Sequence, residues 1–187
     1  MQVYSLMNYF YYFFPNFFNS LVIKDSYLYI NLKPKFLILF LNFLNLHTNI
    51  QFKQILDIWG VDYNLISSRY NVNYLLNSVY LNNRIFLRLF VRDFESLPSA
   101  TSVYNSAGWL EREVWDMFGI FFTNHKDLRR ILTDYGFDSF PLRKEFPLTG
   151  FFELYYNFEE KRIVFDKLEL SQEFRLFDYN NSWTLRK

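Results

Sequence analysis

The apolar residues of this 187-residue chain keep a regular spacing up to about residue 120 and lose it after that point. Within 1–120 they recur at helical or strand intervals, which predicts regular elements that share one core. Residues 121–150 show no clean period, yet they are dense in Arg, Phe, Pro and Leu. A disordered segment lacks such apolar content, so we expect this one to be ordered against another protein. The predicted organisation is a compact α+β domain, 1–120, followed by an extended interface-forming C-terminal tail, 121–187.

Three helices are predicted in the domain, at 1–14, 34–46 and 105–118. Pro15 stops the first helix. Pro34 opens the second, because a proline at the first helical position gives up no hydrogen bond there. Asn105 or Ser106 can cap the third helix, and Gly119 fits the left-handed position that ends it.

Strands are predicted at 21–23, 27–32, 55–61, 72–80 and 84–91, and a late hairpin at 151–158 and 162–170. Along 84–91 aliphatic residues alternate with Arg and Phe, so one face is aliphatic and the other mixes Arg with Phe. Asn82 and Asn83 suit a hairpin turn, because Asn tolerates positive φ. Residues 94–101 are expected to form a loop. The predicted fold is therefore a small mixed or antiparallel sheet packed with helices, followed by the tail.

Composition excludes several classes of site. The chain has no Cys, so it forms no disulfide, cysteine-ligated zinc site or iron–sulfur cluster. His125 with Asp127 and Asp134 could be drawn as a metal site, but the spacing is loose and a structural role is favoured. A net charge of +1 argues against nucleic-acid binding, which needs a basic excess. The 23% aromatic content is typical of codon bias in an AT-rich genome. We expect no cofactor.

Two apolar stretches raise the question of a membrane span. Residues 1–23 carry no charge, but their Asn, Ser, Pro and Tyr residues make them too polar for a lipid-facing helix. Residues 36–46 are too few to cross a bilayer. No direct membrane span is expected. The start of the chain also lacks an Arg-rich presequence and a basic secretory start, so the chain either works where it is made or has been trimmed.

The third predicted helix holds the densest charged segment, 111–116. Arg112 and Asp116 are four residues apart and can pair along the helix. The plain interpretation is a solvated helix face. An acid–base role would require carboxylates in a dry pocket with perturbed pKa values, and the pattern alone does not show this.

Basic pairs in the tail, Arg129–Arg130 and Arg143–Lys144, are matched by carboxylates in the same region. These carboxylates are Glu111, Glu113, Asp116, Asp127, Asp134, Asp138 and Glu145. Guanidinium groups bind carboxylates bidentately, so the balanced set predicts an ordered ion-pair network at a subunit interface. The alternative is a set of screened surface pairs worth under about 1 kcal/mol each.

The segment 108–150 as a whole has a distinctive pattern. Its signature and expected interface residues are Glu111, Arg112, Glu113, Trp115, Asp116, Phe118, Gly119, His125, Asp127, Leu128, Arg129, Arg130, Ile131, Asp134, Tyr135, Gly136, Phe137, Pro141, Leu142, Arg143, Lys144, Phe146, Pro147 and Gly150. This pattern closely resembles one subunit family of respiratory complex I, the NADH:ubiquinone oxidoreductase, called subunit nine in mitochondria and the C subunit in bacteria. The resemblance covers nearly the whole chain.

The resemblance implies a non-catalytic core subunit without an active site or redox centre, which supports NADH-to-ubiquinone electron transfer coupled to proton pumping. It implies that the tail wraps the large quinone-site subunit, beside a cluster-bearing subunit, in the quinone-reducing module of the matrix arm at the mitochondrial inner membrane. A respiratory supercomplex is a further candidate partner. Truncation after about Gly119 is expected to leave a folded body that fails to enter the complex.

Two alternatives stay open. The chain could be the equivalent subunit of a plastid NADH dehydrogenase-like complex or of a membrane-bound hydrogenase, although its composition favours mitochondria. From a different class, it could be an organellar RNA-binding or ribosomal protein that uses its aromatic residues for stacking. The near-zero net charge counts against the second alternative.

Overall fold

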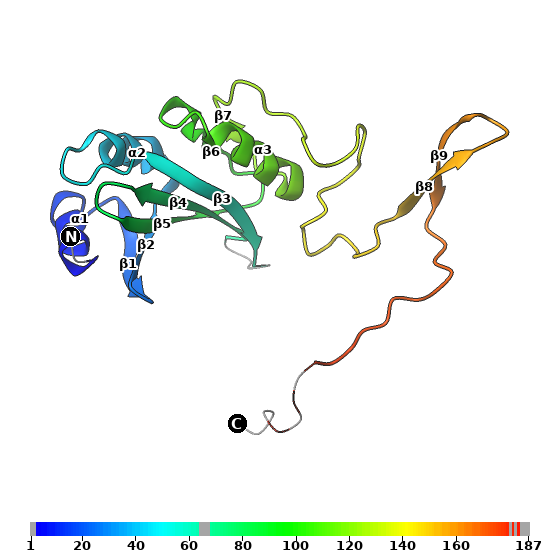
Figure 1. Ribbon diagram of the computed structural model, residues 1–187, viewed down its shortest axis with the longest axis horizontal. Helices are drawn as coiled ribbons and strands as arrows, with labels where there is room; N and C mark the ends of the chain where they lie inside the picture. Colours follow the sequence, from blue (N-terminus) through cyan, green and yellow to red (C-terminus); the bar gives the residue numbers. More distant parts are fainter. Residues whose placement is uncertain (1–2, 64–67, 180, 182, 184–187) are drawn as a thin grey trace. The chain divides into compact units, whose positions relative to one another are not determined.

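A computed structural model describes residues 3–63, 68–179, 181 and 183 (Figure 1). The chain forms two compact units, Met1–Phe146 (unit 1) and Pro147–Lys187 (unit 2). The contacts thus divide the chain later than the boundary expected at residue 120. Six residues of the expected tail, 180, 182 and 184–187, lie outside the described residues.

Unit 1 contains the predicted helices and strands, with ends shifted by a few residues. Its helices are α1 (Val3–Phe13), α2 (Leu37–Leu46) and α3 (Ala107–Phe118), and its 3-10 turns are η1 (Pro34–Phe36) and η2 (Ala100–Ser102). Its strands are β1 (Phe18–Lys24), β2 (Tyr27–Leu32), β3 (Gln54–Asp62), β4 (Tyr70–Ser78), β5 (Asn83–Val91), β6 (Leu97–Pro98) and β7 (Phe122–Thr123). Among the described residues, no helix is both long and apolar enough to cross a membrane.

Local sequence signals explain most element ends. Pro34 opens the 3-10 turn that leads into α2. Ser106 occupies the N-cap position of α3, but its side chain makes no capping hydrogen bond, contrary to expectation. Gly119 ends α3 with φ +74°, and its N–H donates to the carbonyl of Trp115 at 2.8 Å. Asn82 also takes positive φ, at 49°, in the turn before β5.

The main sheet has five strands in the order β1-β2-β5-β4-β3. Strands β2 and β5 are parallel, and the other neighbours are antiparallel. The sheet is therefore mixed, and the expected α+β fold class is confirmed. Helices α2 and α3 lie over the same side of it (Figure 1).

The core of unit 1 lies between the sheet and these helices. The aliphatic face predicted for β5 is fully buried, as Ile85, Leu87, Leu89 and Val91. On β3, Gly60 lies under α3, where an added Cβ would come within 2.7 Å of the Phe118 ring. A side chain at Gly60 would therefore push α3 away from the sheet.

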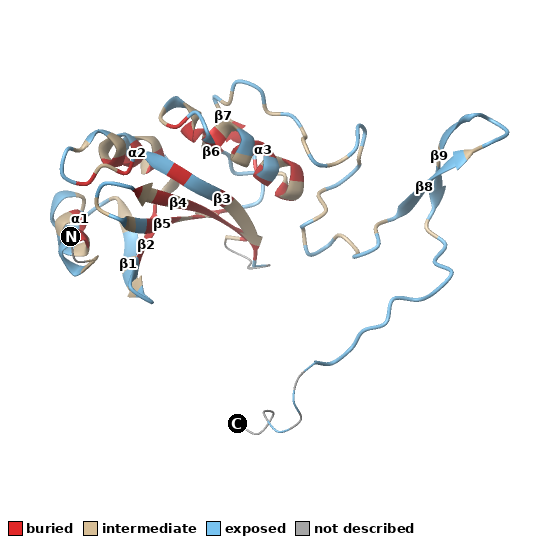
Figure 2. Cartoon of the chain, in the orientation of Figure 1, coloured by how far each residue is buried: buried red, intermediate tan, exposed pale blue. Residues whose placement is uncertain are grey.

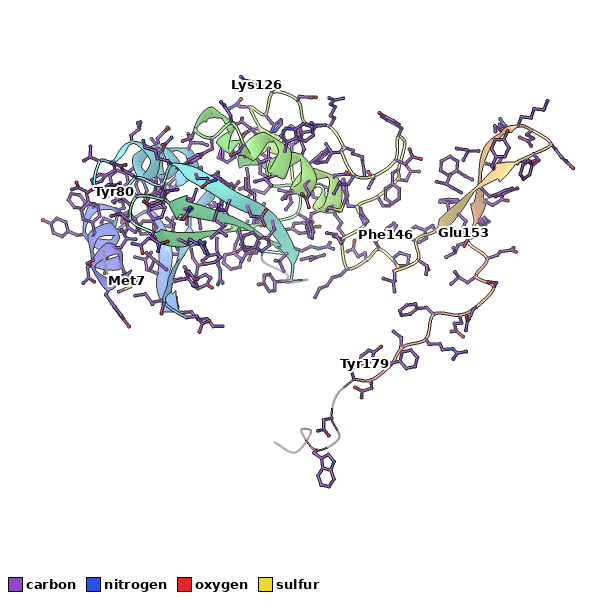
Figure 3. All side chains as sticks on the ribbon, in the orientation of Figure 1. Met7, Tyr80, Lys126, Phe146, Glu153 and Tyr179 are labelled. Carbon is purple, nitrogen blue, oxygen red and sulfur yellow. The ribbon has the colours of Figure 1, made fainter. Side chains whose placement is uncertain are left out.

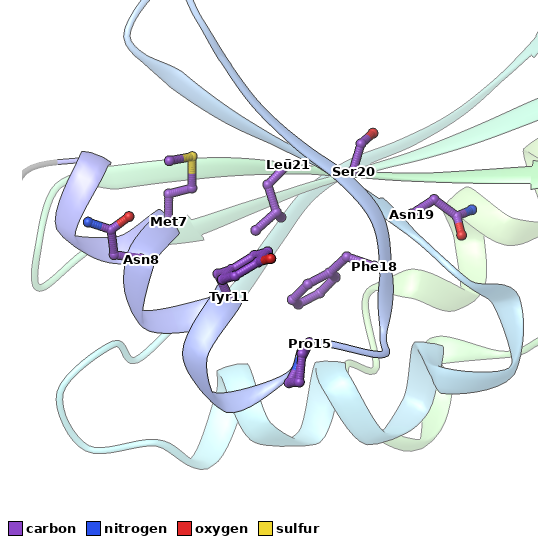
Figure 4. Close-up of a pocket in the computed structure, with 8 residues that line it drawn as sticks. All are labelled: Met7, Asn8, Tyr11, Pro15, Phe18, Asn19, Ser20 and Leu21. Carbon is purple, nitrogen blue, oxygen red and sulfur yellow. The ribbon is translucent and has the colours of Figure 1, made fainter.

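Helix α1 packs on α2 through aromatic rings. Phe10 and Phe40 are both fully buried, and their ring centroids lie 5.4 Å apart at 73°. An open pocket lies between α1 and β1 (Figure 4). Its lining residues are Met7, Asn8, Tyr11, Pro15, Phe18, Asn19, Ser20 and Leu21. The lining holds no carboxylate, imidazole or cationic group and none of the predicted site residues.

A two-strand parallel ladder ties the segment after α3 to the loop before it. Leu97 pairs with Phe122 and Pro98 with Thr123. The N–H of Ser99 donates to the Thr123 carbonyl at 3.0 Å. This ladder, which the sequence pattern did not predict, places residues 97–101 beside the start of the irregular segment 124–146.

The described residues of unit 2 form one hairpin, β8 (Phe152–Asn157) with β9 (Arg162–Lys167), close to the predicted one. Lys161, in the turn, has φ 52°. Figure 2 shows this hairpin mostly in the colour of exposed residues, whereas buried residues gather in α2, α3 and the main sheet. Figure 3 shows its side chains, including the labelled Glu153, projecting from the ribbon.

Candidate functional site

Three charged residues of α3 are buried, so the interpretation of 111–116 as a solvated helix face is wrong for them. Glu111 and Asp116 are 0% exposed and Arg112 is 8% exposed. Glu113, in the same stretch of the helix, is exposed. Burying a carboxylate is costly unless other groups bond to it, so the partners of these residues define the site.

Glu111 holds the loop before α3. Its carboxylate accepts hydrogen bonds from the Ser99 hydroxyl and the Ala100 N–H, both at 2.6 Å. Burial raises the pKa of Glu111 to about 7, and the bonds from Ser99 and Ala100 offset part of that rise. A perturbed carboxyl is therefore present. Because its side chain is fully buried, a substrate has no access to it, and its geometry is that of a structural clamp.

Asp116 organises the turn at 131–133. One carboxylate oxygen accepts the N–H groups of Ile131, Leu132 and Thr133 at 3.1, 2.7 and 3.0 Å. The other oxygen accepts the Thr133 hydroxyl at 2.6 Å and Arg130 Nη1 at 3.3 Å. Burial favours the neutral acid, but the bonds from Thr133, Leu132 and Ile131 outweigh it and hold the pKa of Asp116 below its usual range.

Arg112 does not form the predicted pair with Asp116. Its Nε donates to the Arg129 carbonyl at 3.2 Å, and its guanidinium lies 4.7 Å from the centroid of the Trp109 ring. Asp116 pairs with Arg130 instead. Arg112 and Asp116 thus both attach the irregular segment to α3, at neighbouring points.

Phe140 lies against two arginines. The guanidinium of Arg130 is 4.9 Å and that of Arg143 is 4.5 Å from its ring centroid, within the range of cation–π contacts. Arg130 also donates to the Ser139 carbonyl at 2.9 Å, and Arg143 to the Phe118 carbonyl at 2.7 Å. Arg143 therefore bonds within this chain to a carbonyl and aromatic rings, where a carboxylate partner was expected.

Both the backbone conformation and the close packing at position 119 favour glycine. The φ of +74° at Gly119 is unfavourable for residues with a side chain, and an added Cβ would lie 2.5 Å from the Phe140 ring and 2.7 Å from Arg143 Nη2. The glycine that ends α3 thus also leaves room for the segment that folds back onto the helix.

A second ion cluster joins the far end of this segment to the main sheet. Arg69 Nε and Nη2 donate to both oxygens of Asp62 at 3.0 and 2.9 Å, and Arg69 Nη1 donates to Glu145 at 2.8 Å. Asp62 also accepts the Lys144 N–H at 3.1 Å, and Asp93 lies 3.6 Å from Arg69. The hydrogen bonds that Arg69 donates to Asp62 raise the pKa of its guanidinium further above its already high value.

His125 has a structural role in this geometry. Its Nδ1 accepts the Asp127 N–H at 3.1 Å, so its Nε2 carries the proton and donates to the Gly108 carbonyl at 3.1 Å. Asp134 accepts the N–H of its neighbour Tyr135 instead. Within the described residues, no group of three or more His, Asp or Glu side chains could hold a metal ion.

The remaining predicted residues divide by exposure. Partly buried ones are Trp115, Leu128, Ile131, Phe137, Pro141, Phe146, Pro147 and Gly150. Exposed ones are Glu113, Asp127, Arg129, Asp134, Tyr135, Gly136, Leu142 and Lys144. The partly buried Phe137 and Phe146 contact each other, with ring centroids 5.8 Å apart. The side chain of Arg129 forms an exposed pair with Asp127, at 2.9 Å.

Several residues of the site were not predicted. Asp62, Arg69, Ser99, Thr133 and Phe140 each bond or pack against predicted residues. The sequence could have indicated the Asp62–Arg69 pair. Asp62 follows the predicted strand 55–61 and Arg69 precedes the predicted strand 72–80, so their opposite charges flank the connection between two strands. The others are found only once the fold is known.

This geometry describes a helix whose charged side chains fasten an irregular segment, and residues 30–152 match the family model described as "Respiratory-chain NADH dehydrogenase, 30 Kd subunit". The chain belongs to this family. NADH-ubiquinone oxidoreductase subunit 9 of Reclinomonas americana is 46% identical over 170 residues, which is 91% of this chain and 83% of the relative. The protein of the same name from Prototheca wickerhamii is 51% identical over 150 residues, which is 80% of this chain and 78% of the relative.

A solved structure supports the fold. A chain from the structure of the membrane-bound sulfane sulfur reductase, an archaeal respiratory membrane complex, superposes with a TM-score of 0.66. The superposed region includes 78% of this chain and 85% of the archaeal chain. At 22% sequence identity, this match shows likeness of fold alone. The match to the family model confirms, at the level of the family, the resemblance inferred from residues 108–150.

Proposed function

We propose that this chain is a non-catalytic structural subunit of a respiratory-chain NADH dehydrogenase, complex I. In this role it supports electron transfer from NADH to ubiquinone without carrying a redox centre. Its C-terminal unit binds the large quinone-site subunit, beside the cluster-bearing subunit. The proposed location is the matrix side of the mitochondrial inner membrane, in the peripheral arm.

The observation that carries this proposal is the apolar face of the β8–β9 hairpin. Because partners across an antiparallel pair share a face, the register places five large apolar side chains together. They are Phe152, Leu154, Tyr156, Ile163 and Phe165, which are between 50% and 64% exposed. A two-stranded hairpin is marginal by itself, and an exposed apolar patch of this kind marks an interaction site.

The other face of the hairpin has a different chemistry. It carries Glu153, Asn157, Arg162 and Asp166, with Tyr155 and Val164 between them. The hairpin is thus amphipathic, which favours a partner on one side and solvent or polar groups on the other. We call the side with Phe165 the apolar hairpin face.

The chemistry of the chain supports a structural role. Without Cys it has no ligands for an iron–sulfur cluster. Its perturbed carboxyl, Glu111, is fully enclosed, and the oxygens of Asp116 are occupied by hydrogen bonds from this chain. These groups attach segments of the chain to one another, and the attached segment ends where unit 2 begins.

The test is affinity purification of the assembly through a tag on this chain, followed by lysine cross-linking and mass spectrometry. We expect NADH:ubiquinone reductase activity to co-purify, and Lys161 and Lys167 of the hairpin to link to the large quinone-site subunit. Lys35, at η1 in unit 1, serves as the comparison for hairpin-specific links. The proposal fails if the purified material holds no other protein of the NADH dehydrogenase, or if the hairpin lysines link only to this chain.

A further inference from the structure

Unit 1 has a second surface, which the proposed function does not use. Helices α2 and α3 cover one face of the main sheet (Figure 1). On the opposite face, the side chains along β5 are half-buried or exposed. The register places Tyr29, Leu75, Phe86 and Trp59 near the middle of this face, with Arg88 beside them. We call it the open face.

Strand β5 supplies the charges of the open face. Residues two apart on a strand point to the same side, about 6.6 Å apart. Arg84, Phe86, Arg88 and Phe90 therefore share the open face, while the aliphatic residues between them are buried in the core, and Arg92 follows directly after the strand. This is the mixed Arg and Phe face that the sequence pattern predicts.

These three arginines have no carboxylate partner in the part of the chain that the structure describes. The acidic groups near the end of β5 already have partners other than the guanidinium groups of these arginines. Asp93 pairs with Arg69 at 3.6 Å, and Glu95 accepts the N–H of Arg92 at 3.1 Å. Asp57, at the β3 edge of the face, accepts the N–H of Ile58 at 2.8 Å. Unneutralised guanidinium charge is thus left along one strand.

The aromatic rings of the open face contact one another. Tyr29 and Phe86 are stacked, with centroids 4.6 Å apart and planes 14° apart. The Trp59 ring meets Phe86 edge-on at 6.2 Å, and the Arg88 guanidinium lies 4.2 Å from the Tyr29 centroid. Nucleic-acid bases need free ring faces for stacking, and here Tyr29 and Phe86 already stack on each other, with the Arg88 guanidinium over Tyr29. Apolar rings beside unpaired arginines suit a protein segment that carries carboxylates.

We propose that the open face is the docking site for an acidic segment of another protein, with apolar side chains against Phe86 and Trp59 and carboxylates against the β5 arginines. Charge complementarity carries the choice of occupant, because planar guanidinium groups pair well with carboxylates. The proposal goes beyond the function proposed for the apolar hairpin face. It involves different residues, in unit 1, and requires a separate contact.

The test uses the full-length chain in the assembly purified through it, whatever the composition of that assembly. Arg88→Lys introduces an amine that a carbodiimide joins directly to a carboxylate in contact with it. Tyr80→Lys, in the exposed β4–β5 turn, is the matched control. We expect position 88, and not position 80, to become linked to an Asp or Glu of a different protein.

A second measurement uses the wild-type chain, in case Arg88→Lys disturbs assembly. Phenylglyoxal modification of Arg88 should fall at least about tenfold from the isolated chain to the assembly, because a desolvated contact excludes the reagent. Arg162, exposed on the polar side of the hairpin, provides the reference.

Four results would overturn the proposal. The first is a carbodiimide cross-linking yield at position 88 no higher than at position 80, together with phenylglyoxal modification of Arg88 that is equal in the assembly and in the isolated chain. Position 88 could link only to Asp57 of its own chain. It could link to a second copy of this chain. Ultraviolet cross-linking could instead join Tyr29 or Phe86 to RNA.

Discussion

Replacing Phe165 by Ala removes one anchor of the apolar hairpin face. The side chain is 60% exposed in the chain by itself, and Leu154 lies directly across from it in the hairpin register. A Phe residue offers about 200 Å² of accessible area, so a partner would cover about 120 Å² of it. At about 25 cal/mol per Å², the substitution removes up to about 3 kcal/mol of binding free energy, or roughly 100-fold in affinity.

Tyr155→Ala is the matched control for this prediction. Tyr155 is 47% exposed and lies on the opposite face of the same hairpin, in β8. Each variant is expressed at equal level with a distinguishable wild-type chain, and quantitative mass spectrometry measures their ratio in the purified assembly. We expect Phe165→Ala to be strongly under-represented and Tyr155→Ala to be close to wild type. Equal incorporation of both variants, or equal loss of both, would refute the reasoning.

Three further predictions concern unit 1. Burial raises the pKa of Glu111 from 4.5 to about 7, so between these pH values the native state holds a proton on Glu111 that the unfolded chain has lost. The free energy of unfolding therefore falls by up to about 3 kcal/mol as the pH rises from 4.5 to 7. Denaturant titrations between pH 5 and 8 should lose this slope in Glu111→Gln; an unchanged slope would contradict the assignment. Gly119→Ala should lower the melting temperature more than Gly136→Ala, because both have φ +74° but only the first places a Cβ against Phe140; equal effects would show that the contact is unimportant. Arg130→Lys should reduce stability, since it weakens the ion pair with the buried Asp116 and removes the guanidinium from the Phe137 and Phe140 rings. Arg129→Lys should be nearly neutral, because Arg129 forms an exposed pair. A larger loss of melting temperature in Arg129→Lys than in Arg130→Lys would contradict the site description.

Much of the fold followed from local pattern. The alternation along β5 predicted its buried aliphatic face, and the glycine after the last helical residue predicted the left-handed end of α3. Strand and helix positions were recovered because their burial depends on periods of two and about 3.6 residues. The late hairpin was predicted around its charged turn at 159–161.

The state of the charged residues in α3 could not be predicted in this way. Glu111 and Asp116 become buried because residues 97–101 and 131–133 cover them, and those contacts depend on the β6–β7 ladder. Asp62 meets the Lys144 N–H across 82 positions of sequence. Helical periodicity describes one element, so it cannot show which irregular segment will cover a polar face.

The contacts also change where the chain can be divided. Truncation after about Gly119 would remove the bonding partners of Asp116 and the buried residues Ile120 and Phe122 from the body. The cut would also expose the core side chains that Ile120 and Phe122 cover, so it would damage the fold as well as any assembly. The division between the two units, after Phe146, is the cut that isolates the proposed binding function.

The measurement that tests the central claim most directly is native electrophoresis of solubilised membranes, with NADH dehydrogenase activity staining and peptide identification. The full-length chain and a chain truncated after Phe146 are expressed in parallel, and both are checked for a folded unit 1 by thermal melting. We predict that the full-length chain migrates in the active band and that the truncated chain folds but is absent from it. A full-length chain outside the active band, or a truncated chain within it at the full-length level, would contradict the account.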